Sequence, residues 1–94
     1  MYNPDNAYAY YNLGACYSRE GEVKQALGYA LKALQIKPDM YEGIVLTATC
    51  YKLMRDDENA EKYCRILEEN GGDASELRRI LNVLRFGVTS DTKG

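Results

Sequence analysis

The chain contains an internal repeat, because residues 41–74 follow the pattern of residues 7–40. Moving residues 7–40 along the chain onto residues 41–74 also places Pro4 on Pro38. We call this displacement along the chain the repeat shift. Five pairs in the overlap are identical: Cys16 with Cys50, Tyr17 with Tyr51, Ala26 with Ala60, Tyr29 with Tyr63, and Asp39 with Asp73. A period of roughly 20–50 residues is typical of repeat architectures, in which each unit is one small supersecondary motif.

Each unit is predicted to be a pair of helices. In the first unit, residues of one helix face recur at i, i+3, i+4 and i+7: Tyr10, Leu13, Gly14 and Tyr17. Gly21 suits a left-handed C-cap that would end this helix. An apolar stripe from Val23 to Leu34 predicts a second helix, which Pro38 would stop.

Three further helices are expected. Asp39 with Glu42 three residues later forms a capping-box pattern, which predicts a third helix over about residues 40–54. A fourth helix is expected over about residues 57–69, before a break at Asn70–Asp73. A fifth helix would start at Asp73, with Glu76 three residues later, and residues 87–94 would form a flexible tail because they lack apolar periodicity.

The first unit resembles the tetratricopeptide repeat, a helix–turn–helix unit of about 34 residues. The matching residues are Tyr10, Leu13, Gly14, Tyr17, Ala26, Ala33 and Pro38. The second unit is more degenerate: Ile44, Ala48, Tyr51 and Ala60 match, whereas Arg55 stands in place of the turn glycine.

The resemblance implies an all-α fold, a right-handed superhelix of two antiparallel helix hairpins with a C-terminal capping helix. Residues 1–86 would form a single domain, with repeat one at about 7–40, repeat two at about 41–73 and the capping helix at about 74–86.

Gly14 needs a physical reason, because a glycine inside a helix costs about 1 kcal/mol relative to alanine. The resemblance supplies one, since a small residue after the leucine lets the two helices of a repeat cross closely. Ala26 would be its counterpart on the second helix. Cys16 and Cys50 occupy another position where small residues are usual, so tight helix packing is expected of both rather than a redox role.

Composition excludes several classes of function. The chain of 94 residues has no histidine, so Cys–His and Ser–His nucleophilic catalysis are excluded, and its three cysteines lack the spacing of a zinc site. We therefore expect no enzyme, no catalytic residue, no cofactor and no metal.

Composition and charge also restrict the partners that this protein is expected to bind and the compartment in which it is expected to occur. A net charge of −2 disfavours nucleic acid as a partner, although the fifth helix carries Arg78, Arg79 and Arg85. No segment is apolar enough to span a membrane, and the N-terminus does not resemble a secretory signal. An odd number of cysteines without paired spacing favours a reducing compartment, so a cytoplasmic location is expected.

The resemblance implies a scaffold that binds a protein or peptide in a concave groove lined by the first helix of each pair. The partner-binding residues would be Tyr8, Tyr11, Asn12, Ala15 and Arg19 from the first repeat, and Glu42, Val45, Leu46, Thr49 and Lys52 from the second. Arg79, Ile80 and Val83 would extend this face if the fifth helix continues the superhelix. Exposed apolar and aromatic residues gathered on one face often mark a binding site.

A second hypothesis is structural self-association. Two repeats are few, because about three are usually needed for stability. The fifth helix would cover the C-terminal edge, whereas nothing comparable covers the N-terminal edge. Either the chain is a fragment of a longer array, or a second copy covers that edge in a homodimer, with Tyr2, Tyr8 and Tyr11 available for the contact.

Overall fold

The computed structural model describes residues 6–93, with side chains described as far as Leu84. It contains five helices and, over the described residues, no strand: α1 (Ala7–Arg19), α2 (Val23–Ile36), α3 (Tyr41–Leu53), α4 (Asp57–Glu69) and α5 (Ser75–Lys93). The predicted all-α fold is confirmed. Tyr2 and Pro4 lie outside the described residues.

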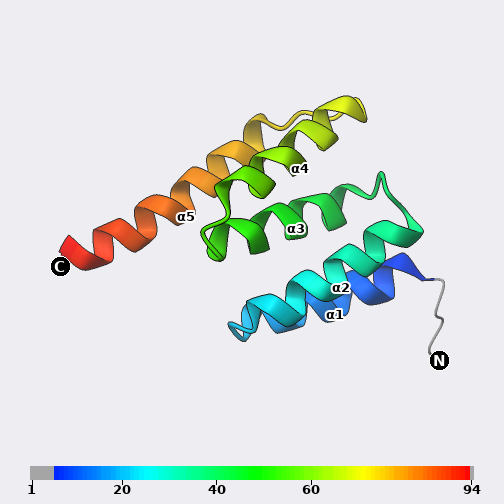
Figure 1. Ribbon diagram of the computed structural model, residues 1–94, viewed down its shortest axis with the longest axis horizontal. Helices are drawn as coiled ribbons and strands as arrows, with labels where there is room; N and C mark the ends of the chain where they lie inside the picture. Colours follow the sequence, from blue (N-terminus) through cyan, green and yellow to red (C-terminus); the bar gives the residue numbers. More distant parts are fainter. Residues whose placement is uncertain (1–5, 94) are drawn as a thin grey trace.

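The helices form two antiparallel hairpins followed by a single helix (Figure 1). Helices α1, α3 and α5 run in one direction, and α2 and α4 run in the opposite direction (Figure 1). Helix α3 is central, because it packs against each of the other four helices. It accordingly contributes the most buried residues: Gly43, Ile44, Leu46, Thr47, Ala48 and Cys50.

Three helices end in the same hydrogen-bonded turn. At the end of α1, the backbone N–H groups of Gly21 and Glu22 donate to carbonyls of the last turn at 3.0 and 2.9 Å, which is the Schellman motif. Helices α3 and α4 end in the same way at Arg55 and Gly71. The backbone is left-handed at all three positions, with φ of +84° at Gly21, +66° at Arg55 and +87° at Gly71. The left-handed cap predicted at Gly21 is confirmed.

The capping box predicted at the start of α3 is wrong. The N-cap of α3 is Met40, and no side chain caps the helix. Asp39 lies 3.6 Å from the ammonium group of Lys37, and Glu42 accepts a hydrogen bond from the hydroxyl of Tyr8. Met40 is only 1% exposed and is packed among residues of the first hairpin, so burial of its side chain fixes where α3 begins.

Two side-chain caps were not expected from the sequence. Asn6 accepts hydrogen bonds from the N–H groups of Tyr8 and Ala9 at 3.0 and 3.2 Å, which satisfies two unpaired donors at the start of α1. Asp56 caps α4 in the same manner through the N–H of Asn59.

Helix α5 begins in the register of the repeat. The starts of α1, α3 and α5, at Ala7, Tyr41 and Ser75, are each separated by one repeat shift. Helix α5 therefore begins two residues after Asp73, whose carboxylate accepts from the N–H of Ser75 at 2.9 Å. It continues to Lys93, so most of the segment expected to be a tail is helical.

The reason predicted for Gly14 is confirmed. A Cβ added there would lie 3.1 Å from the carbonyl oxygen of Ala26 and 2.9 Å from Cδ2 of Leu46. The backbone of α2 therefore crosses directly over this glycine, and a side chain of α3 fills the space beside it. Buried Ala26 faces Gly14, as the resemblance implied.

Both hairpins contain the same aromatic stack. The rings of Tyr17 and Tyr29 lie 5.5 Å apart in the first, and those of Tyr51 and Tyr63 lie 5.9 Å apart in the second. The two pairs are related by the repeat shift, and stacked rings at such distances stabilise the contact between two helices. The sequence repeat is therefore also a repeat of side-chain packing.

Candidate protein-interaction surface

Helices α1, α3 and α5 place equivalent residues next to each other. The hydroxyl of Tyr8 on α1 lies 3.5 Å from Oε1 of Glu42 on α3, and these two positions are 34 residues apart. The three helices run in parallel and start in the same register, so residues of one side recur from helix to helix (Figure 1). We call this side the α1–α3–α5 face.

The predicted residues of α1 are largely accessible. Tyr8 is 48% exposed, Asn12 and Arg19 are exposed, and Tyr11 and Ala15 are half-buried. The guanidinium group of Arg19 lies 3.8 Å from the sulfur atom of Cys16. Helix α1 thus presents an aromatic and polar surface without any acidic residue.

The predicted residues of α3 are less accessible. Glu42, Val45, Thr49 and Lys52 are half-buried. The hydroxyl of Thr49 donates to the carbonyl of Val45 at 2.8 Å, and the ammonium group of Lys52 is paired with Asp57 at 2.8 Å. Their polar atoms are therefore partly engaged within the chain.

Leu46 is not part of the accessible surface, contrary to the sequence prediction. It is 9% exposed and belongs to a core cluster with Ala26, Ala30 and Cys50. The physical reason is the missing side chain at Gly14, because this gap admits the end of Leu46 between α1 and α2. Of the four apolar or aromatic residues predicted for this face, Tyr8, Tyr11 and Val45 remain accessible and Leu46 does not.

Helix α5 carries two exposed apolar side chains at positions that were predicted to extend this face. Ile80 is 37% exposed and Val83 is 61% exposed, and both occupy positions equivalent to residues of the predicted groove. Arg79, which the sequence also assigned to this face, is paired with Glu76 on its own helix.

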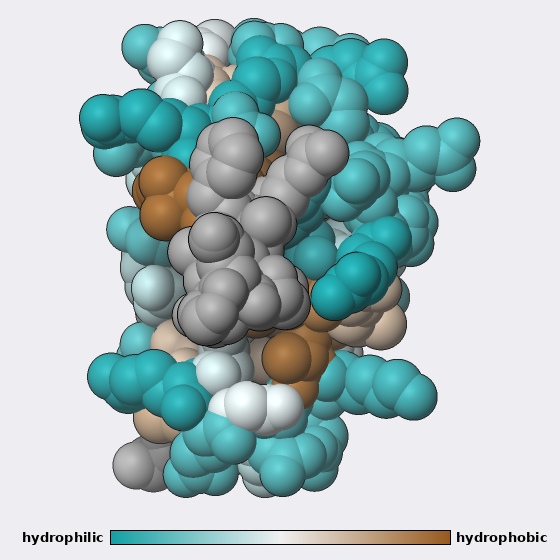
Figure 2. All heavy atoms as spheres, turned by 90° about the vertical axis from the view of Figure 1, so that its left-hand side faces the viewer, coloured by the Kyte–Doolittle hydropathy of each residue, from teal (hydrophilic) through white to brown (hydrophobic). Residues whose placement is uncertain are grey.

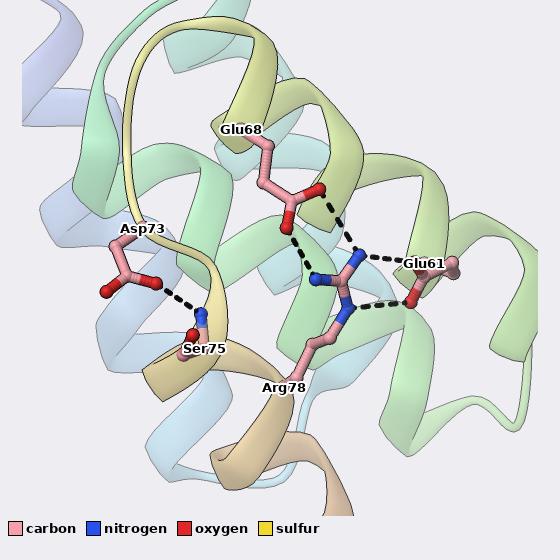
Figure 3. A network of polar contacts seen from close by, with 5 residues as sticks. All are labelled: Glu61, Glu68, Asp73, Ser75 and Arg78. Atoms are coloured by element: carbon pink, nitrogen blue, oxygen red, sulfur yellow. Dashed lines mark hydrogen bonds and ion pairs between the residues drawn. The ribbon is translucent and has the colours of Figure 1, made fainter.

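A network of ion pairs holds α5 against α4 (Figure 3). The guanidinium group of Arg78 lies between two carboxylates of α4, with N–O distances of 2.5 Å to Glu61 and 2.6 Å to Glu68. The hydrogen bond from Arg78 lowers the pKa of Glu61, and the two carboxylates in turn raise the pKa of Arg78. Helical periodicity did not indicate which carboxylates Arg78 pairs with, because they lie 10 and 17 residues away from it in the chain.

Residues 7–40, which comprise α1, α2 and the turn that follows, match the family model of the tetratricopeptide repeat. The chain therefore contains a tetratricopeptide repeat at residues 7–40. No curated protein and no solved structure shows significant similarity to it. Tetratricopeptide repeats mediate protein–protein interactions and are not enzymes.

The face of α1 that carries Leu13 and Cys16 is exposed, whereas the equivalent face of α3 is buried. Leu13 is 39% exposed and Cys16 is exposed, whereas their equivalents Thr47 and Cys50 are 0% exposed. The first hairpin covers the face of α3, and no described residue covers the corresponding face of α1. The tight packing predicted for Cys16 is therefore wrong, although it is correct for Cys50.

The end of the repeat domain at which α1 and α3 finish is mainly hydrophilic. Figure 2 shows hydrophobic atoms on either side of the grey ones, within a surface that is largely teal. Leu53 and Met54, at the end of α3, are 41% and 39% exposed.

Over the described residues, no helix is both long and apolar enough to cross a membrane.

Proposed function

We propose that this tetratricopeptide repeat chain binds a segment of a partner protein on its α1–α3–α5 face. The proposal is carried by the accessible side chains that recur on this side at the spacing of the repeat. The proposed contact residues are Tyr8, Tyr11, Asn12, Ala15, Arg19, Glu42, Val45, Thr49 and Lys52, with Ile80 and Val83 on α5. Tyrosine provides a large contact area at low cost in conformational entropy, which suits such a role.

We further propose that residues 41–73 are a second repeat and that residues from 74 onward form a capping helix. The support is the Schellman turn at Arg55 and the tyrosine stack of α3 with α4, each one repeat shift from its counterpart. Helix α5 buries Leu77 and Leu81 against this second hairpin, as a capping helix would.

Site-specific photo-crosslinking tests the proposed face. A photoreactive amino acid replaces Tyr8 in one variant and Gln25, an exposed residue of α2, in another. We expect a partner to be crosslinked from position 8 and not from position 25. Equal crosslinking from both positions, or crosslinking from position 25 alone, would contradict the proposal.

The purified partner then allows affinities to be compared. Tyr11→Ala and Val45→Arg should each weaken binding by about tenfold or more, because both remove apolar contact area. Gln25→Ala is the control and should leave the affinity unchanged. An affinity that is insensitive to Tyr11 and Val45 would place the partner elsewhere.

Self-association is the second candidate, and the accessible face of α1 favours it. Leu13 and Cys16 are exposed, whereas the equivalent residues of α3 are buried. A second copy of the chain could cover this face of α1 as the first hairpin covers that of α3. Light scattering over a range of concentrations should then show a mass of twice 10.6 kDa, and Leu13→Glu should restore the monomer. A monomer at all concentrations would exclude this candidate and leave the face open to other proteins.

A cytoplasmic location is part of the proposal. Its support is that Cys16, Cys50 and Cys64 are all free thiols. Free thiols persist where the surroundings are reducing.

A further inference from the structure

Three glycines inside helices differ in what surrounds them. A Cβ added at Gly14 would lie 2.9 Å from a carbon of Leu46, and one added at Gly43 would lie 2.9 Å from a carbon of Leu34. At Gly28, in the middle of α2, an added Cβ would meet no atom within 4 Å. Packing within the chain therefore accounts for Gly14 and Gly43, whereas it gives no reason for Gly28.

Gly28 lies in a groove between α2 and α4, which we call the α2–α4 groove. It has a volume of about 460 Å³ and is lined by Gly28, Leu31, Lys32, Leu34, Gln35 and Tyr63. Because Gly28 has no side chain, the backbone of α2 is accessible in this groove. Glycine commonly occurs where another molecule approaches the backbone closely.

Lys32 is the one charged side chain among the six residues that line the groove. Helix α2 carries Lys24 and Lys32, each one turn from Gly28, and no acidic residue. On α4, the ammonium group of Lys62 lies 5.9 Å from the centre of the Tyr63 ring. No carboxylate is among the six lining residues.

The carboxylates of α4 that are fixed by ion pairs belong to another side of that helix. Glu61 and Glu68 are bonded to Arg78 of α5. Tyr63 shares a helix face with Asn59 and Ile66, at i−4 and i+3, and both are uncharged. An acidic group entering the groove would therefore meet Lys32, and none of the six lining residues carries a carboxylate.

We propose that the α2–α4 groove is a second protein-binding site, which takes an acidic peptide segment with an aliphatic side chain. The aliphatic side chain packs on Leu31, Leu34 and Tyr63 above the bare backbone at Gly28. A neighbouring Asp or Glu of the partner pairs with Lys32. This site is formed by α2 and α4, so it is distinct from the α1–α3–α5 face and does not depend on the function proposed for that face.

Selection from a phage-displayed library of random heptapeptides tests the proposal. Peptides enriched on the wild-type protein are synthesised, and their affinities are measured by fluorescence anisotropy. We expect one enriched class to combine Leu, Ile or Val with Asp or Glu. Gly28→Gln, which fills the groove, and Lys32→Glu, which reverses its charge, should each weaken that class by about tenfold or more.

Two control variants distinguish binding in the α2–α4 groove from binding at another surface. Arg65→Glu makes the same charge reversal at an exposed residue of α4 that does not line the groove, and Tyr11→Ala alters the α1–α3–α5 face. Both should leave the affinity of the acidic–aliphatic class unchanged. Thermal melts should show that Gly28→Gln is at least as stable as the wild type, so any loss of binding is not a loss of fold.

Two outcomes would overturn the proposal. One is a selection in which every enriched peptide is weakened by Tyr11→Ala and unaffected by Gly28→Gln, which would support the α1–α3–α5 face alone. The other is a selection that yields no peptide sensitive to either Gly28→Gln or Lys32→Glu.

Discussion

Arg55 adopts a backbone conformation that is usually reserved for glycine. Its φ of +66° is left-handed, as is φ at the equivalent Gly21 and at Gly71. Glycine adopts this conformation freely, whereas a residue with a Cβ is strained by about 1 kcal/mol. The Schellman hydrogen bonds of the turn hold Arg55 in place despite this cost.

Replacement of Arg55 by glycine should therefore stabilise the protein. We expect Arg55→Gly to raise the free energy of unfolding by about 1 kcal/mol and the melting temperature by about 5 °C. Gly21→Ala is the matched control and should lower stability by a similar amount, because it introduces the same strain. Thermal denaturation followed by circular dichroism measures both, and an Arg55→Gly variant that melts below the wild type would disprove the argument.

Replacement by alanine should change the free energy of unfolding in opposite directions at Gly14 of α1 and at Gly28 of α2. Gly14→Ala forces a Cβ against the carbonyl of Ala26 and the side chain of Leu46, so it should cost about 1–3 kcal/mol. Gly28→Ala meets open space and gains helix propensity, so it should stabilise by up to about 1 kcal/mol. Urea denaturation of both variants measures the difference, and two changes of the same sign would refute this account of the packing.

At the scale of the elements, α5 is attached to the second hairpin by two kinds of contact. Leu77 and Leu81 are buried in the core cluster, and Arg78 bridges the carboxylates of Glu61 and Glu68 (Figure 3). The apolar contacts supply most of the attachment, because surface ion pairs contribute little individually. The bidentate geometry at Arg78 fixes the orientation in which α5 presents its exposed residues.

Stability should depend on pH through this network. The folded pKa of Glu61 lies below its ordinary value of 4.5, so the pair stabilises the folded state above about pH 4.5, and this contribution is lost as the pH falls through the folded pKa. Arg78→Gln should therefore lower the melting temperature at pH 7 and have a smaller effect near pH 3. A constant effect at all pH values would exclude the ion pair as its cause.

Arg79→Gln provides the control for this experiment. Arg79 is paired only with Glu76 on its own helix in the described contacts, and its side chain is 72% exposed. Solvent screens such a pair, so its removal should change the melting temperature little at any pH.

At the scale of the whole molecule, position within the array decides what is buried. Helix α3 packs on four neighbours, whereas α1 packs on α2 and α3. Residues with the same place in the repeat therefore have different surroundings, as Leu13 and Thr47 show. Thr47 tolerates full burial because its hydroxyl donates to the carbonyl of Gly43 at 2.8 Å.

The three thiols should differ in reactivity for the same reason. Cys16 is exposed, whereas Cys50 and Cys64 are buried and have raised pKa values, about 11 for Cys50. The thiolate is the reactive form, so a maleimide should label one cysteine per folded chain, at Cys16. Mass spectrometry after brief labelling gives the count, and labelling in denaturant should raise it to three. Rapid labelling of all three thiols in the folded protein would contradict the burial of Cys50 and Cys64.

The sequence by itself determined the repeat, the helix pairs and the close crossing at Gly14. These features depend on local periodicity and on residues such as Gly21 and Pro38, whose backbone preferences act within one or two turns. Most of the residues proposed for the α1–α3–α5 face were implied by the resemblance of the sequence to the tetratricopeptide repeat, and they share one side of each helix because such positions recur at regular spacing.

Only the tertiary structure decided which equivalent residues are buried. Leu46 enters the space left by Gly14, Met40 rather than Asp39 is the N-cap of α3, and Cys16 is exposed where Cys50 is enclosed. The α2–α4 groove likewise combines residues of two helices that are not neighbours in the chain. Burial depends on which elements surround a position, and that information lies in the packing of distant segments rather than in the period of one helix.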